Sequence, residues 1–282
     1  MAEIGLTEVS ATSQAVVANV VQMVLKQESV LIPTVSDWSR FAVPGASSVK
    51  APRRTQFAAA NKSENTPLVA QELTFSADTI DLNKHKAIYA SLERIAGIQS
   101  MVDVQAEVLV EQAKELALQI DKDIITQLKL VSTAAPDHLL DYANTPTDTL
   151  QQTDILEARK LLNIQKVPLA DRFMVISPDQ EKAVLLLSDF VRADSYGTPD
   201  GLRNGELGRI YGFTVLMHTE LAAVDSLFYH SSHVGYATQL NPEFKTDFDL
   251  KNVADEFLLH QLYGTRVLDL GKRGIYFNGT GA

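Results

Sequence analysis

The feature that most constrains the fold is a run of about 31 residues, Ser100 to Val131, without proline or glycine. At about 1.5 Å of rise per residue, one helix of this length would measure about 47 Å. Ser100 and Asp103 resemble a capping box at its start. Apolar residues recur along the run at helical spacing, namely Val102, Leu109, Leu116, Ile120, Ile124 and Leu128. The sequence therefore predicts one very long helix, well above the usual length in globular proteins.

A row of carboxylates accompanies this helix. Glu107, Glu111 and Glu115 recur at i, i+4 spacing and share one helix face. Neighbouring carboxylates can perform acid–base chemistry, but on an exposed helix such a row is usually a solvated surface. We interpret it as solvated.

The segment before the helix is expected to be a long two-stranded excursion. Prolines and glycine punctuate residues 33–68, and the stretch "RRTQFAAANKSENT" is too polar to build a core. Apolar and polar residues then alternate through residues 73–92, which is typical of strands. The pattern predicts a hairpin that leaves the body near Val49 and returns near Leu82. Because an isolated hairpin is only marginally stable, it needs another surface, such as a second subunit.

Residues 10–28 predict an amphipathic helix with the stripe Val16, Val17, Val20, Val21, Val24 and Leu25. Two interpretations stay open: a helix packed on its own domain, or an arm that binds a partner.

A second unit follows the long helix and a loop at 132–150. It combines a helix from Asp154 to Gln165, a buried strand "RFMVIS", and a helix capped by Ser177 with Pro178 at its first position. The glycine-containing loop "RADSYGTPDGLRNGELG" precedes strand-like segments from Arg209 onward. The fold class is α+β.

Motifs for catalysis or cofactor binding are weak. Gly205, Gly208 and Gly212 have the wrong spacing and context for a dinucleotide or phosphate loop, so we interpret them as turn and bulge positions. His230 and His233 stand three apart in an expected strand, where they would face opposite sides. The chain has no cysteine. We expect no enzyme activity, no cofactor and no metal.

Charge and hydropathy limit the classes of partner that the chain is expected to bind. The net charge is -10, which disfavours gripping nucleic acid through its backbone. The N-terminus lacks the features of a signal peptide and no apolar run is long enough to span a bilayer. We expect a soluble protein made in the cytoplasm, without membrane contact.

The order of these elements resembles the major capsid protein of tailed double-stranded DNA bacteriophages, with the Hong Kong 97-like fold. The phrase "GRIYGFTV", residues 208–215, resembles the family's "G-x-I-x-G-F-x-V" strand, and Leu116–Leu128 resembles the end of its spine helix. The resemblance covers about residues 30–277. A cellular encapsulin nanocompartment, which shares the fold, is the alternative, and an unrelated enzyme is a more distant one.

The resemblance implies a division of the chain. It places an N-terminal arm at 1–44, an extended loop at 45–85, a peripheral domain at 86–144 and 241–282 with the spine helix at about 100–131, and an axial domain at 145–240. It further implies self-assembly as hexamers and pentamers into an icosahedral virion capsid. The packaged double-stranded DNA would be held without sequence-specific binding. A separate scaffolding protein and a portal protein are the expected partners.

Charged residues of the two long loops are the candidates for contacts between subunits. In the extended loop they are Arg53, Arg54, Lys62 and Glu64; in the later glycine-containing loop they are Arg192, Asp194 and Arg203.

Overall fold

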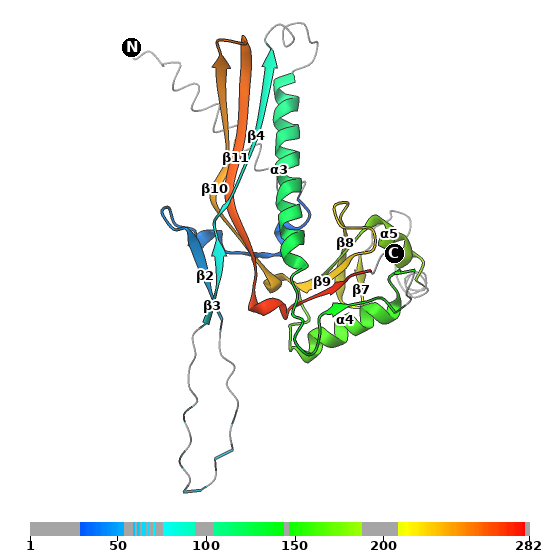
Figure 1. The fold of residues 1–282 in the computed structure, drawn as a ribbon. Helices are drawn as coiled ribbons and strands as arrows, with labels where there is room; N and C mark the ends of the chain where they lie inside the picture. The colour runs from blue at the N-terminus through cyan, green and yellow to red at the C-terminus, as the bar shows by residue number, and fades with distance from the viewer. Residues whose placement is uncertain are drawn as a thin grey trace.

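The computed structural model describes residues 29–53, 76–93, 104–143, 147–187 and 208–279, with isolated positions between 59 and 70. Two sheets and a two-stranded hairpin organise this part of the chain (Figure 1). The strands of the four-stranded sheet run in the order β1-β10-β11-β4, and those of the six-stranded sheet in the order β5-β12-β9-β6-β8-β7. The hairpin pairs β2 with β3. The α+β class is confirmed.

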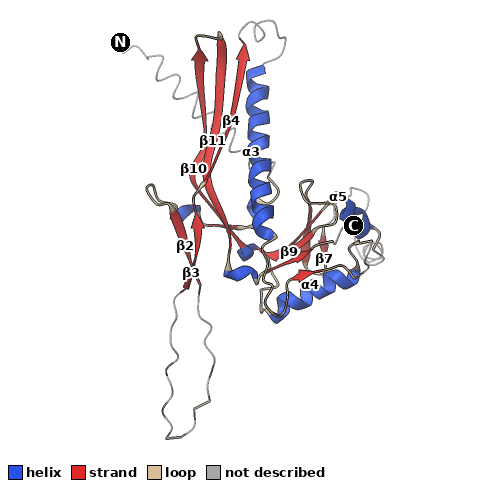
Figure 2. Ribbon diagram, in the orientation of Figure 1, coloured by secondary structure: helices blue, strands red, loops and turns tan. Residues whose placement is uncertain are grey.

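The long helix α3 spans Val104–Leu128 and lies along the four-stranded sheet (Figure 2). Its apolar stripe is buried against that sheet, with Leu116, Ile120 and Ile124 each 0% exposed. The expected start at 100–103 lies outside the described residues. The helix ends three residues before Val131. Just after it, Ser132 N–H donates at 3.2 Å to the carbonyl of Gly271 in the 3-10 turn η4 (Asp269–Gly271).

The sheet beside α3 is built from three long strands and one short one. They are β4 (Lys84–Glu93), β10 (Val234–Asp249), β11 (Ala254–Val267) and β1 (Ser36–Asp37). β10 and β11 form an antiparallel hairpin, and β4 pairs antiparallel with β11. Alternate residues of β4 are exposed, as expected for a sheet covered by a helix on one face.

The second unit has helices α4 (Gln152–Ile164) and α5 (Pro178–Leu185) beside the six-stranded sheet (Figure 1). Ser177 caps α5 by accepting from Gln180 N–H, which confirms the predicted cap. Its core is a separate apolar cluster that includes Met174, Phe213 and Phe228. The sheet strands are β5 (Leu139–Leu140), β6 (Arg172–Ile176), β7 (Arg209–Ile210), β8 (Phe213–Met217), β9 (Ser226–His230) and β12 (Gly274–Phe277).

Two sequence expectations need correction here. Grouping all of residues 241–282 with the long helix is wrong for β12, which pairs antiparallel with β9 in the six-stranded sheet. The four-stranded sheet also begins before residue 241, because β10 already starts at Val234. The chain thus passes between the two units twice near its C-terminal end.

The glycines that precede β8 serve the backbone. Gly208 has φ +56° and Gly212 has φ +88°, and Tyr211 beside it has φ +47°. Residues 211–212 form the tight turn between β7 and β8, where left-handed backbone favours glycine. The turn interpretation is confirmed for Gly212; Gly208 has left-handed backbone just before β7, and Gly205 lies outside the described residues.

Salt bridges join α3 to the six-stranded unit. Lys129 Nζ lies 2.6 Å from Asp225, and Lys122 Nζ lies 3.2 Å from Glu220. Asp225 is 3% exposed, so its pair is shielded from solvent. These two ion pairs link the six-stranded unit to the last turns of α3 and to the residue that follows it.

Candidate subunit-contact surface

The extended hairpin is the part of the fold most suited to contact another molecule. β2 (Ser48–Arg53) and β3 (Ser76–Asp81) pair antiparallel, from Ser48 opposite Asp81 to Arg53 opposite Ser76. In Figure 1 the hairpin stands beside the long strands, away from the six-stranded unit. The hairpin predicted between Val49 and Leu82 is therefore confirmed at its base.

Apolar packing holds that base against the body. Val49, Ala51, Ile80 and Leu82 are buried in a small cluster with Ala237 and Leu268. This cluster is separate from the cores of the two larger units. This packing thus holds the base of the hairpin, which we call its root, in one place.

Two glycines of the sheet let the hairpin approach closely. A Cβ added at Gly264 of β11 would lie 2.3 Å from the backbone oxygen of Asp81. A Cβ at Gly235 of β10 would lie 2.7 Å from Cδ1 of Ile80. Because backbone atoms cannot move aside as a flexible side chain can, Gly264 is the stricter requirement.

Replacing Gly264 by alanine is expected to lower the free energy of unfolding by about 1–3 kcal/mol, since the methyl group forces β3 off β11. Denaturant unfolding of the subunit measures this. Ser91→Thr adds a methyl on an exposed position of β4 and should change stability by less than about 0.5 kcal/mol. If both variants changed the free energy of unfolding equally little, the hairpin base would accommodate the added methyl group without loss of stability.

Charged groups reinforce the root. Arg53 pairs with Asp78 across the hairpin, and its Nε lies 4.0 Å from Asp269 Oδ1 in η4 (Asp269–Gly271). Asp78 Oδ2 accepts from the backbone N–H of Asp269 at 2.8 Å, and Arg273 Nε donates to Asp269 at 3.1 Å. Arg53 therefore contacts its own subunit, a role that sequence reasoning did not assign to it.

The remaining candidates divide into two groups. Lys62 and Glu64 are exposed, near a turn in the loop beyond the hairpin base. Arg54, Arg192, Asp194 and Arg203 lie outside the described residues.

The far end of the β10–β11 hairpin carries a surface that sequence reasoning missed. Leu250 is 83% exposed and Val253 is 51% exposed, both in the turn between the strands. Val253 has φ +49°, which is unusual for a β-branched residue. The signal in the sequence was the apolar Leu250 between Asp249 and Lys251, at the end of an alternating strand.

The histidines considered as metal ligands do not converge. His230 ends β9 and its Nδ1 faces Ser232 at 2.8 Å, whereas His233 Nε2 lies 3.3 Å from the carbonyl of Leu128. A 3-10 turn, η3 (Ser231–His233), separates β9 from β10, so the expected continuous strand was wrong there. Among the described residues, no group of three or more potential ligands could hold a metal ion. No helix in that part of the chain is long and apolar enough to cross a membrane.

Comparison of the fold with solved structures gives a consistent answer. A chain from Mycobacterium phage Che8 aligns with a TM-score of 0.73 and 19% identity, covering 90% of this chain and 92% of that one. The mature capsid of bacteriophage PhiM1 aligns with a TM-score of 0.66 and 14% identity, covering 90% and 88%. A virus-like particle from Pyrococcus furiosus aligns with a TM-score of 0.62 and 7% identity, covering 94% and 99%. These likenesses establish the Hong Kong 97-like fold.

Comparison at the level of sequence separates the candidate functions that share this fold. No curated protein matches the chain. The model of a family described as phage capsid protein matches residues 77–250, which is more than half of the chain. That segment includes α3, both helices of the second unit and all of β10. The chain is thus a major capsid protein, a structural component of the icosahedral phage shell rather than an enzyme, and it belongs to the phage capsid protein family.

Proposed function

We propose that the shell is assembled from hexamers and pentamers in which the extended loop of each subunit lies over its neighbour. The observation that carries this proposal is the anchored root of the β2–β3 hairpin, whose apolar cluster is separate from the two larger cores. A rigid root directs the loop to one place on an adjacent subunit. The contacts of Lys62 and Glu64 with that neighbour are part of the proposal.

The proposed domain division follows the two sheets. The peripheral domain comprises α3 and the four-stranded sheet, and the axial domain comprises the six-stranded sheet with α4 and α5, including β12. The arm is proposed to end, and the extended loop to begin, near residue 45. In sequence, residues 188–207 connect α5 to β7, and Arg192, Asp194 and Arg203 of this segment are proposed contacts between subunits.

Further partners complete the proposal. A scaffolding protein and a portal protein are proposed to direct closure of the shell. The DNA inside is proposed to be enclosed without sequence-specific contacts, since a net charge of -10 keeps phosphate groups from adhering to the wall.

Negative-stain electron microscopy of the purified chain, alone and with a scaffolding protein, tests this organisation. The expected particles are closed shells, or rings with five-fold and six-fold symmetry. Monomers alone across protein concentration and salt, with scaffold present, would overturn the proposal.

The exposed turn of the β10–β11 hairpin gives a more specific prediction. Leu250→Asp should leave the melting temperature of the isolated subunit nearly unchanged, because the side chain is exposed and makes no core. Shell yield should fall several-fold, because an apolar surface repeated in every subunit loses its contact. Leu250→Met, which keeps the apolar character, is the control. Wild-type yield from Leu250→Asp would exclude this turn from the contacts.

A further inference from the structure

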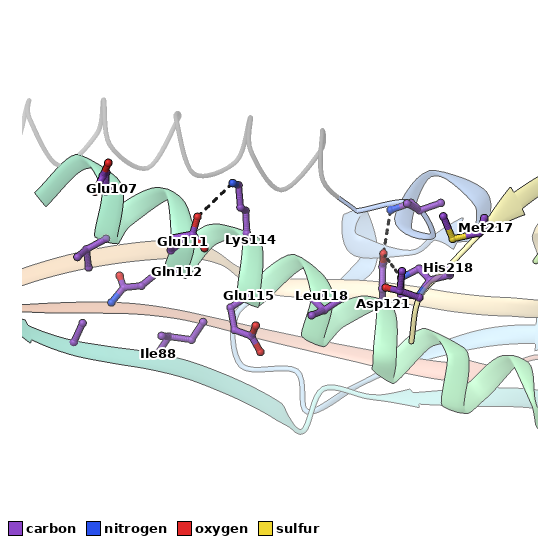
Figure 3. Close-up of a pocket in the computed structure, with 14 residues that line it drawn as sticks. Ile88, Glu107, Glu111, Gln112, Lys114, Glu115, Leu118, Asp121, Met217 and His218 are labelled. Atoms are coloured by element: carbon purple, nitrogen blue, oxygen red, sulfur yellow. Dashed lines mark hydrogen bonds and ion pairs between the residues drawn. The ribbon is translucent and has the colours of Figure 1, made fainter. Parts of the chain in front are cut away.

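An apolar groove of about 840 Å³ runs along α3 (Figure 3). Ile88 of β4, Val108 and Leu118 of α3, and Met217 at the end of β8 contribute apolar walls. The glutamates of the predicted solvated row, including Glu107 and Glu111, line its edge beside Lys114. A groove of this kind beside a long helix suits an amphipathic helix laid along it.

The described chain enters this groove at a fixed point. Asp121 of α3, 1% exposed, accepts from Ser29 Oγ at 2.6 Å and from Val30 N–H at 3.0 Å. His218 Nε2 lies 3.3 Å from the same carboxylate. Val30 itself lines the groove. The described part of the chain therefore begins at one end of the groove.

The sequence of that preceding segment matches the groove in character and length. Its valines at 16, 17, 20, 21 and 24, with Leu25, form an apolar stripe at helical spacing. From Glu107 to Asp121, α3 rises about 21 Å, and a helix over residues 15–29 would rise by the same amount. The contact between Ser29 and Asp121 joins residues 92 apart in sequence. If two helices run parallel from the contact between Ser29 and Asp121, residues that lie side by side keep about the same separation in sequence. Val16 would then lie beside Val108, and Leu25 beside Leu118.

We propose that residues 14–28 form a helix that docks into this groove of its own subunit. Ser29 is already held at Asp121, so the stripe begins only a few residues from its binding site. This short tether gives the segment a high effective concentration at the groove, which a second copy or a scaffolding protein would have to exceed. The docked helix would cover the apolar walls before any assembly takes place.

Thiol accessibility tests the docking, because the chain has no cysteine of its own. Leu118→Cys in the full-length subunit should react slowly with a maleimide. Adding Val20→Asp and Val24→Asp should release the helix and speed the reaction about tenfold or more. The matched control, Asn19→Asp with Gln22→Asp, places the same charges on the opposite helix face and should leave the reaction slow. Leu250→Cys provides the rate of a fully accessible thiol.

If the thiol at position 118 reacted with the maleimide equally fast with the wild-type segment and with the Val20→Asp/Val24→Asp segment, the proposal would be overturned. A groove protected only after another protein is added would do the same, since the occupant would then be that protein.

Disulfide formation distinguishes the subunit's own segment from that of a neighbour. Leu25→Cys combined with Leu118→Cys should yield an oxidised monomer of altered mobility on a non-reducing gel. Covalent dimers in place of that monomer would show exchange of the segment between subunits and contradict docking within one subunit. Failure to form hexamers and pentamers would not affect either assay, because both are performed on unassembled protein.

Discussion

Deleting residues 55–66 is expected to leave a folded subunit that no longer forms stable shells. The hairpin base keeps its β2–β3 pairing, its apolar cluster and the contacts of Arg53 and Asp78, because all of these lie outside the deletion. The two larger cores, as far as the described residues show them, are built from other parts of the chain. The melting temperature should therefore change little, while shell yield should fall to near zero.

The size of the assembly effect follows from repetition. One exposed charge pair contributes at most about 1 kcal/mol. A closed shell repeats every contact in each subunit, so a small loss per contact decides whether the shell forms.

The control for this deletion is a glycine–serine segment of the same length, which restores loop length without side-chain contacts. We expect it to behave like the deletion. Unfolding of the deletion variant would show that the loop packs on its own subunit. If the deletion variant formed shells of wild-type stability, the loop would make no stabilising contact with a neighbouring subunit.

Acidification from pH 6.5 to pH 4 is expected to destabilise the subunit by about 3 kcal/mol through His233 alone. Burial is the largest of the effects that lower the pKa of His233 to about 4; the nearby His138 and Arg273 contribute in the same direction, while the carbonyl of Leu128 partly opposes the change. Gly274 packs directly against the ring, since a Cβ there would lie 2.4 Å from its Nε2. The ring has no room for a hydration shell.

The direction of this effect follows from proton binding. Between the folded pKa of about 4 and the ordinary value of 6.5, the unfolded chain binds a proton that the folded chain does not. Stability is therefore complete above pH 6.5 and declines as the pH falls toward 4.

Urea unfolding at several pH values measures the slope. His233→Gln, whose amide can still donate to Leu128, should flatten the profile in this range. His85→Gln alters an exposed histidine of β4 and serves as the matched control. Identical slopes in the wild type and His233→Gln would contradict the account.

Local patterns predicted much of the fold because periodicity and capping are local properties. The stripe of α3, the Ser177 cap and the turn at Gly212 were all visible as residue spacing. Pro242 lies inside β10. β10 continues through it, because register shifts between Leu240 and Glu243 accommodate a residue without a backbone N–H.

The rest depended on contacts between distant segments. The pairing of β12 with β9 and the anchoring of Arg53 at η4 arise from tertiary packing. Nothing in the sequence near Arg53 distinguishes an ion pair within the subunit from one between subunits. For the candidate surface, the sequence located the hairpin but not its root or the exposed turn at Leu250.

A cryo-electron microscopy reconstruction of the assembled shell tests the central claim most directly. The account predicts that density for residues 54–75 extends from the β2–β3 root across an adjacent subunit, with Lys62 and Glu64 at the interface. Density that folds back onto the same subunit, in shells of normal stability, would contradict it.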